Sequence, residues 1–330
     1  MNTPIKNPLP LAARSEVGER FPFSASPRGW YAVAWVDQLA LASIKPAKLC
    51  ERDIVVVRTA SGQLSVYDAH CPHLGAHLGY GGVVEDENIR CPFHGWEYDG
   101  QGRCSRIPFV DGPMKLTLRQ WPTVVRGGML QAWFDEAGGP PLWTPVEVDQ
   151  EGWTIPVHWP DCAWNLRAHV QDIAENGIDV AHFTTVHGAE AIGELREMRF
   201  EGALARWTSI SASELSGKPS IAQADVVLDA LGLHQVQVMI DDGKLQFRSF
   251  LYVTPVAEGR IDIRMTVSVK QTGDPRKDRM LVKYLVPRLT GELAKDFDIW
   301  ENKIYIERPP LSRVDGPIRQ FRTWARGFYE

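Results

Sequence analysis

The sequence has no long hydrophobic run and no excess of positive charge. No stretch approaches the roughly 20 consecutive apolar residues that span a membrane, so we expect no transmembrane segment. The first 15 residues contain three prolines and no continuous apolar core, which argues against a secretory signal. Lys and Arg number 36 against 41 Asp and Glu, a net charge of −5. Because nucleic-acid binding normally requires a basic face, we expect no nucleic-acid partner.

Cysteine is also scarce. The chain has five cysteines among 330 residues, and three of them, Cys50, Cys104 and Cys162, are scattered along the sequence. This pattern argues against a disulfide framework and is typical of a reducing compartment, so we predict a cytoplasmic protein. Hydrophobic residues make up 44% of the chain and charged residues 23%, which indicates a globular protein of one large or two ordinary domains.

The other two cysteines belong to paired motifs. Cys71-Pro-His73 is followed after 17 residues by Cys91-Pro-Phe-His94, and a glycine lies close behind each motif. Glycine lets the backbone bend tightly around a bound centre. Two thiolates and two imidazoles in such loops are the ligands of a Rieske [2Fe–2S] cluster, in which two histidines replace two cysteines on one iron. A structural zinc site is the alternative, although zinc sites seldom combine C-x-H with C-x-x-H.

The pattern of apolar residues predicts an α+β protein of two parts. Short β-rich runs separated by glycine turns predict a small β-domain from Gly29 to about Asp135. A helix is predicted over about 170–183, and β-rich runs over about 222–269 predict an antiparallel meander. A long helix follows over roughly 277–306, which Pro287 is positioned to interrupt.

Glycines and prolines at 137–141 mark the boundary between the two parts. We therefore predict an N-terminal segment, a β-rich domain and a second domain over residues 1–27, 28–136 and 137–330.

A second group of candidate metal ligands lies near the middle of the chain. His182 and His187 are five residues apart, so an uninterrupted helix would place them on different faces. If both bind one metal, the helix must end or distort between them, which the β-branched pair Thr184-Thr185 favours. The alternative is two ordinary histidines at a helix end.

A carboxylate would complete a two-histidine, one-carboxylate triad, which holds Fe(II) and leaves positions open for O2. The long C-terminal helix offers Asp296 and Asp298. Asp296 borders the apolar stripe that includes Leu293 and Trp300, whereas Asp298 points roughly 140° away from Leu293 by helix geometry. We predict Asp296 as the ligand and Asp298 as a solvated surface carboxylate.

Asp179 lies three residues before His182, on the same face of the predicted helix. It is placed to hold the second imidazole nitrogen and fix its tautomer, as metal-bound histidines usually require. The alternative is an acid on the helix surface.

Together these motifs resemble the terminal oxygenase component of Rieske non-haem iron oxygenases, from about Phe21 to the C-terminus. The segments Cys71-Pro-His-Leu-Gly-Ala76, Cys91-Pro-Phe-His-Gly-Trp96 and Glu175-Asn-Gly-Ile-Asp-Val-Ala-His182 are most similar to the cholesterol 7-desaturase group. The ending from Asp315 onward is also similar to the oxygenase component of bacterial 3-ketosteroid 9α-hydroxylase. Both groups act on steroid nuclei.

The resemblance implies a β-rich Rieske [2Fe–2S] domain and a helix-grip (START/Bet v 1-like) catalytic domain with a curved antiparallel sheet, on which the N-terminal segment packs. It also implies a head-to-tail homotrimer, in which Asp179 bridges a cluster histidine of one subunit to an iron histidine of the next. The implied ligands are Cys71, His73, Cys91 and His94 for the cluster, and His182, His187 and Asp296 for a mononuclear Fe(II).

The implied activity is the oxygenase part of a monooxygenase that hydroxylates or desaturates a sterol or steroid with O2. Electrons come from NAD(P)H through a separate reductase, with or without a ferredoxin. No dinucleotide fingerprint follows any predicted strand, which fits a separate reductase. Two alternatives remain: an oxygenase for an aromatic or other hydrophobic small molecule, and an electron carrier. A carrier needs only the Rieske domain, so the second half of the chain argues against it.

Two further expectations concern the surroundings of the metals. Respiratory-type Rieske proteins carry an extra cysteine in each loop, where this chain has Ala76 and Phe93, so we expect a cluster of lower potential. A steroid requires a mostly apolar pocket. Candidates for its lining, each also explained by ordinary core packing, are Trp207, Met239, Phe247, Phe250 and Tyr252.

Overall fold

The computed structural model describes residues 21–24, 26–147, 149–156, 159, 161–213, 220–240 and 243–330. The chain forms two compact units, the first built mainly from Arg28–Asp149 and the second mainly from Trp159–Glu330, to which Gln150–Thr154 also belongs. From the sequence we expect the boundary between residues 136 and 137. The units part later because Trp143 packs into the first unit, where its carbonyl oxygen accepts a hydrogen bond from Trp30 Nε1 at 2.9 Å.

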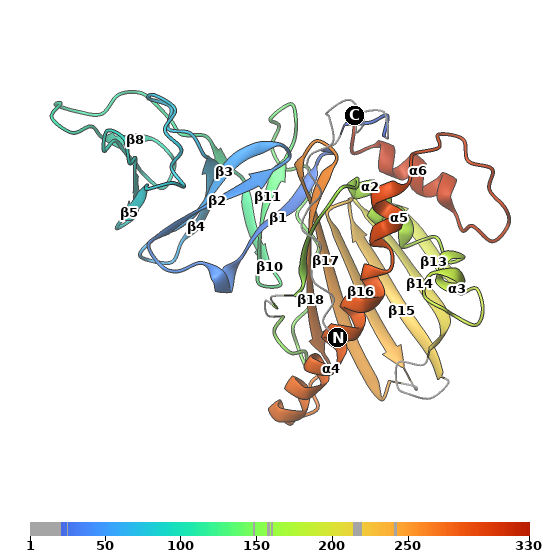
Figure 1. Ribbon diagram of the computed structural model, residues 1–330. Coiled ribbons are helices and arrows are strands. Elements are labelled where there is room, and N and C mark those ends of the chain that lie inside the picture. Colours follow the sequence, from blue (N-terminus) through green and yellow to red (C-terminus); the bar gives the residue numbers. More distant parts are fainter. Residues whose placement is uncertain are drawn as a thin grey trace. The chain divides into compact units, whose positions relative to one another are not determined.

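The first unit contains three small antiparallel sheets (Figure 1). Their strand orders are β1-β11-β10, β2-β3-β4-β9 and β5-β6-β7-β8. The strands are β1 Gly29–Trp35, β2 Ser43–Leu49, β3 Arg52–Arg58, β4 Leu64–Asp68, β5 Val83–Glu85, β6 Asn88–Arg90, β7 Glu97–Tyr98, β8 Cys104–Arg106, β9 Gln120–Trp121, β10 Thr123–Arg126 and β11 Met129–Phe134. This confirms the β-rich domain that the sequence predicts.

Strand β3 is shared by two hydrophobic cores of this unit. It contains four consecutive apolar residues, and successive side chains of a strand point to opposite faces. Ile54 and Val56 therefore enter one core. Val55 and Val57 enter the other core, which also contains both cysteines of the paired motifs. The strand thus ties the candidate cluster loops to the rest of the unit.

The second unit is built on a seven-stranded antiparallel sheet of order β12-β18-β17-β16-β15-β14-β13. Its strands are β12 Ala163–Leu166, β13 Glu194–Glu201, β14 Leu204–Ser213, β15 Ser220–Asp229, β16 Leu233–Ile240, β17 Leu245–Ala257 and β18 Arg260–Val269. Its helices are α2 Val170–Asn176, α3 His182–Thr185, α4 Pro275–Ala294, α5 Phe297–Asn302 and α6 Ile318–Arg326. The predicted meander is confirmed, and it begins earlier than expected, at β13.

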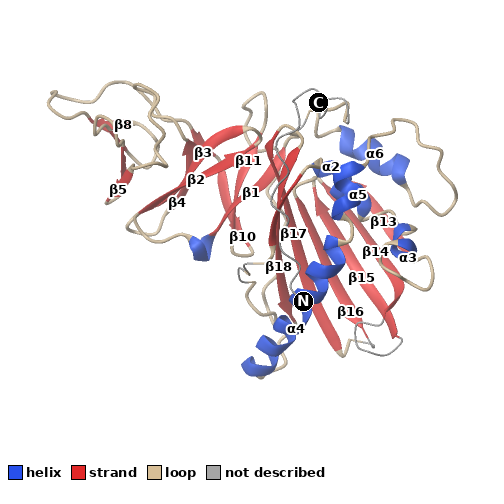
Figure 2. Cartoon of the chain, viewed as in Figure 1, coloured by secondary structure: helices blue, strands red, loops and turns tan. Residues whose placement is uncertain are grey.

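Helix α4 runs across one face of this sheet (Figure 2). Its Val282, Leu285 and Val286 pack with sheet residues such as Phe247 and Val267. This face is the one that the helices cover.

The strand register assigns the remaining pocket candidates to a face. Trp207 is connected through its cross-strand neighbours on β15 and β16 to Ser249, which lies two residues from Phe247. Trp207 and Phe247 therefore share the helix-covered face, because alternate residues of a strand point the same way. Met239, Phe250 and Tyr252 belong to the opposite face.

The helix predicted over 170–183 is wrong in its second half. Helix α2 ends at Asn176 and is followed by Gly177, a residue of low helix propensity. The Asp179 carboxylate then accepts a hydrogen bond from the Ala181 N–H at 3.2 Å, a local contact that competes with helix continuation. A new short helix, α3, begins only at His182.

The long C-terminal helix also differs from expectation. It does not stop at Pro287; α4 continues to Ala294, and α5 begins at Phe297 after a short break. None of the helices in the described parts of the chain is long and apolar enough to cross a membrane.

The N-terminal segment 1–27 lies partly outside the described residues, which omit 1–20 and 25. In the second unit, the Phe21 ring stacks on His169 with centroids 3.8 Å apart. Phe23 packs against Tyr305 and Tyr329, at centroid distances of 5.2 and 5.1 Å. Packing of residues 1–20 stays a prediction.

Candidate metal centres

The two Cys–His motifs occupy two loops of the same design in the first unit. Cys71 follows β4 and Cys91 follows β6. In the first loop the Gly75 N–H donates to the Cys71 carbonyl oxygen at 2.9 Å, and in the second the Gly95 N–H donates to the Cys91 carbonyl oxygen at 3.1 Å. Both glycines have positive φ values, 75° and 69°, which other residues rarely adopt. Glycine is therefore strongly favoured at the turn that closes each loop.

The four candidate cluster ligands differ in how deeply they are buried. Cys71 and Cys91 are each 2% exposed, whereas His94 is exposed and His73 half-buried. The two imidazole centroids are 4.8 Å apart, and His73 stacks on Trp96 at 4.1 Å. The thiols lie inside the unit and the imidazoles at its surface. This arrangement fits a cluster whose two irons have different ligands, two sulfurs on one side and two nitrogens on the other.

Tyr98 lies beside the buried thiols. Its hydroxyl is 3.0 Å from Cys71 Sγ, and the side chain is fully buried. Burial and the neighbouring cysteines raise the pKa of Tyr98 far above its usual range, so the phenol keeps its proton. A protonated hydroxyl is a hydrogen-bond donor to a thiolate, which would stabilise negative charge on a bound cluster.

The second group of candidates converges at one point of the second unit. Asp296, in the break between α4 and α5, is 3% exposed. Its two carboxylate oxygens face the histidines: Oδ2 is 3.3 Å from His187 Nε2, and Oδ1 is 3.9 Å from His182 Nε2. Within the described ranges, these three residues form the one group of His, Cys, Asp and Glu whose ligand atoms all lie within 4.8 Å.

Hydrogen bonds orient both histidines of this compact group, which consists of His182, His187 and Asp296. His182 Nδ1 donates to the carbonyl oxygen of Asp179, and His187 Nδ1 donates to Glu292 Oε2 at 3.1 Å. Each Nε2 then faces Asp296, and that of His182 also lies beside the Asn176 side-chain amide. Burial lowers the pKa of His187, but Asp296 and Glu292 outweigh burial and raise it overall. Protons therefore compete with a metal for this ligand in acid.

Comparison with known proteins assigns the chain to a family. A model of the Rieske [2Fe–2S] domain matches residues 29–122, and a model of the 3-ketosteroid 9α-hydroxylase C-terminal domain matches residues 132–329, more than half of the chain. The chain is a Rieske non-haem iron oxygenase.

Individual relatives of this oxygenase agree with that assignment. The cholesterol 7-desaturase of Bombyx mori is 28% identical over 338 residues, covering 96% of this chain and 72% of the relative. The oxygenase component of the 3-ketosteroid-9-alpha-monooxygenase of Rhodococcus rhodochrous is 27% identical over 319 residues, covering 92% and 83%. Dicamba monooxygenase bound to dicamba shares the fold, with a TM-score of 0.72 and 21% identity over 91% of this chain and 96% of that one.

The oxygenase is thus an oxidoreductase that uses a [2Fe–2S] cluster and a mononuclear iron and receives electrons from NAD(P)H through a reductase. The donor sets described above suit these groups. The buried thiols and surface imidazoles match the mixed ligation of a Rieske cluster, and two imidazoles with one carboxylate match mononuclear iron.

Asp179 contacts His182 in a way that the sequence does not predict. Its main-chain oxygen, and not its carboxylate, accepts the hydrogen bond from His182 Nδ1. The expected tautomer-fixing role therefore belongs to the backbone, because the helix on which the expectation depended ends before Asp179. Within the described parts of the chain, the half-buried carboxylate accepts a side-chain hydrogen bond from the Ala181 N–H alone.

Sequence reasoning missed two residues at the compact group. Asn176 Nδ2 lies 3.1 Å from His182 Nε2, so its amide reaches the metal-facing nitrogen. Glu292 holds His187 from the other side. A signal for Glu292 existed, since it precedes Asp296 by four residues, about one helical turn. Asn176 carried a weaker signal, an asparagine and a glycine where a continuous helix was expected.

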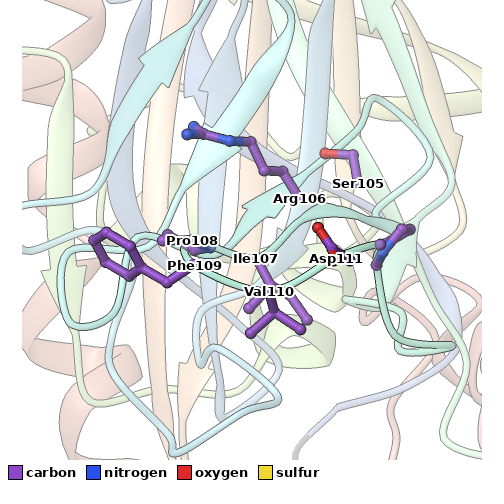
Figure 3. A pocket seen from close by; sticks show the side chains of 9 residues that line it. Ser105, Arg106, Ile107, Pro108, Phe109, Val110 and Asp111 are labelled. Atoms are coloured by element: carbon purple, nitrogen blue, oxygen red, sulfur yellow. The ribbon is translucent and has the colours of Figure 1, made fainter.

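A pocket of about 490 Å³ lies in the first unit and is lined by residues Ser105–Pro113 (Figure 3). Pro108 of this loop approaches the second cluster loop, since a Cβ on Gly95 would lie 3.1 Å from Pro108 Cγ. None of its lining residues belongs to either ligand set. The pocket is a feature of the loop beside the candidate cluster and not of the catalytic group.

Proposed function

We propose that this oxygenase hydroxylates or desaturates a sterol or steroid, with O2 as oxidant. The C-terminal match to the 3-ketosteroid 9α-hydroxylase domain supports a steroid substrate. So do the names of the relatives, which span most of this chain and include cholesterol 7-desaturases and 3-ketosteroid-9-alpha-monooxygenase.

The observation that carries the proposal is the convergence of His182, His187 and Asp296. We assign these residues as the ligands of the mononuclear iron. The cluster ligands that we propose are Cys71, His73, Cys91 and His94.

When bound, the cluster supplies single electrons and the iron activates O2 for attack on a C–H bond. The chain positions and shields these groups. The hydrogen bonds at Nδ1 hold both imidazoles with Nε2 facing inward. Asp296, almost fully buried, contributes negative charge in a place with little water. The Asn176 side-chain amide, which lies beside His182, is a polar neighbour at the edge of the compact group.

The helix-covered face of the sheet supports an apolar substrate. Trp207, Val226 and Val236 lie in one cross-strand row on this face. Trp207 is 3% exposed and approaches α2 at Gly177, where a Cβ would lie 3.4 Å from the indole ring. The row therefore reaches the helix whose last residue, Asn176, contacts His182. We propose that this row contributes to a hydrophobic substrate pocket.

We also propose a head-to-tail homotrimer, in which the cluster of one subunit serves the iron of the next and Asp179 bridges the two centres. The exposed position of His94 supports transfer at the surface of the first unit. Asp179 is half-buried and joined to His182 through its carbonyl oxygen. A cytoplasmic location is proposed as well, since none of the five cysteines is paired in a disulfide.

Iron content and product analysis test the proposed function together. The purified holoprotein should contain about three irons per chain, two in the cluster and one mononuclear. It is reduced without oxygen, exposed to O2 with sterols, 3-ketosteroids or aromatic acids, and its products are analysed by mass spectrometry. Oxidised steroid is the expected product. Two irons per chain and no turnover would instead identify a carrier, and turnover of aromatic acids alone would overturn the steroid assignment.

A further inference from the structure

Glu292 contacts a histidine of the compact group from outside. It lies in the last turn of α4, four residues before Asp296. Its Oε2 is 3.1 Å from His187 Nδ1. Lys295 Nζ lies 2.8 Å from both carboxylate oxygens of Glu292 and holds that carboxylate in place. His187 is therefore held between two carboxylates from one segment, Glu292 at Nδ1 and Asp296 at Nε2.

The two histidines of the group have acceptors of different charge. His182 Nδ1 donates to a neutral main-chain carbonyl, that of Asp179. His187 Nδ1 donates to a carboxylate, and a hydrogen bond to a charged acceptor is roughly twice as strong as a neutral one. A stronger acceptor at Nδ1 makes Nε2 the better electron donor to a metal. The contacts predict that His187 is the stronger electron donor of the two histidine ligands.

We propose that Glu292 is a positioning residue: it fixes the tautomer and orientation of His187 and strengthens its bond to the mononuclear iron. This inference rests on the proposed function, because it assumes that His187 is an iron ligand. Glu292 acts through His187 and is not itself a ligand, since its side chain is 46% exposed whereas that of Asp296 is 4% exposed.

The competing explanation is an ordinary surface ion pair between Glu292 and Lys295. Such pairs contribute little to stability. An ion pair alone predicts that removal of Glu292 changes neither iron binding nor the electronic environment of iron. The positioning role predicts that both change, although the fold does not.

The test compares Glu292→Gln and Glu292→Ala in the full holoprotein, with Asp298→Asn as the matched control. Asp298 is an exposed carboxylate six residues further along the same segment. Gln keeps an acceptor for His187 Nδ1 but loses the charge, and Ala loses both. Fe(II) affinity is measured by titration of iron-depleted protein, and the site is probed by EPR of its nitric oxide complex. The visible spectrum of the cluster and the thermal midpoint report on the rest of the protein.

We expect Glu292→Ala to weaken Fe(II) binding about 10- to 100-fold and to change the EPR spectrum. Glu292→Gln should lie between Ala and wild type, and Asp298→Asn should match wild type. All variants should keep the cluster spectrum and the thermal midpoint. Wild-type affinity and an unchanged EPR spectrum in Glu292→Ala would overturn the inference. The proposed function would survive that result if Asp296→Ala still lost iron, and it would fail if wild type bound no mononuclear iron.

Discussion

At the scale of single residues, the choice between two nearby aspartates is the sharpest prediction. Asp296 is almost fully buried beside both histidines, whereas Asp298 is exposed. Asp296→Ala should lose the mononuclear iron and all turnover, while Asp298→Ala keeps both. Iron analysis of the two variants, with the cluster spectrum as the internal standard, decides the matter. Retention of mononuclear iron by Asp296→Ala would reverse the assignment.

A substitution of Asp179 can test its negative charge without changing its shape. Its carboxylate oxygen accepts the Ala181 N–H, and an asparagine in this position keeps an acceptor for that bond. Asp179→Asn should therefore preserve both metal centres and remove only the negative charge. We expect turnover to fall to near zero in steady-state assays, with iron content and the cluster spectrum intact. Normal coupled turnover would rule out the bridge.

Single residues also show how much of the site can be predicted from the sequence. Asp296 was distinguishable from Asp298 because only Asp296 borders an apolar stripe, whose Leu293 and Trp300 pack inward on either side of the break in the helix. Asn176 and Glu292 were not found, because their contacts with His182 and His187 depend on how α2 and α4 are brought to α3. Spacing along a chain does not reveal contacts made across 105 residues.

At the scale of elements, α6 is fastened to α2 by a mostly buried ion pair. Arg322 Nε and Nη2 donate to the two Glu175 oxygens at 2.7 Å each. Arg322→Met would leave the Glu175 carboxylate buried without its partner, which costs about 3 kcal/mol. We expect a correspondingly lower free energy of unfolding by denaturant titration. Arg326→Met, at an exposed position of the same helix, is the control, and equal stability of the two variants would contradict this account.

Element boundaries were less predictable than element types. The periodic signal over 170–183 is helical, but it does not register the glycine and the aspartate side chain that end α2 and delay α3. Pro287 predicted an interruption of the helix, but α4 continues through it. The packing of Val282, Leu285 and Val286 on the sheet accompanies that continuation and outweighs local propensity.

At the scale of the whole molecule, the proposed head-to-tail trimer would allow subunits to complement each other. His94→Ala should disable the cluster and leave the iron, and Asp296→Ala should do the reverse. Each variant alone is expected to be inactive. Trimers co-assembled from both should recover part of the activity, because an intact cluster can face an intact iron in the neighbouring subunit. Assays of such mixtures without any recovery would indicate transfer within one subunit.

Acid should destabilise the second unit. Burial lowers the pKa of His169 and of His234 to about 4, against about 6.5 in the unfolded chain. Above pH 6.5 both histidines are neutral in either state, so stability is complete. As the pH falls from 6.5 to 4, the unfolded chain binds protons that the native state does not bind. This lowers the free energy of unfolding by up to about 3 kcal/mol per histidine.

Denaturant titrations across this pH range, followed by tryptophan fluorescence, check the prediction. His234 Nε2 has no hydrogen-bond partner among the described residues, so His234→Leu should remove roughly half of the acid sensitivity without losing a bond at that nitrogen. An unchanged pH dependence in this variant would exclude His234 as a source.

The two-part architecture was predictable because the Cys–His and His–His–Asp signals lie in separate halves of the chain. The unit boundary was not, since the packing of Trp143 on Trp30 and Trp133 is a tertiary event that the glycines and prolines at 137–141 do not reveal.

The strand shared by two cores has a consequence for how the cluster unit loses its structure. Since Ile54 and Val56 face one core and Val55 and Val57 the other, neither core can melt while the other keeps β3 in place. We expect the first unit to unfold in a single cooperative transition, in which release of the cluster and collapse of the β1-β11-β10 sheet coincide. Cluster bleaching would then report global unfolding of this unit rather than local fraying of the two loops.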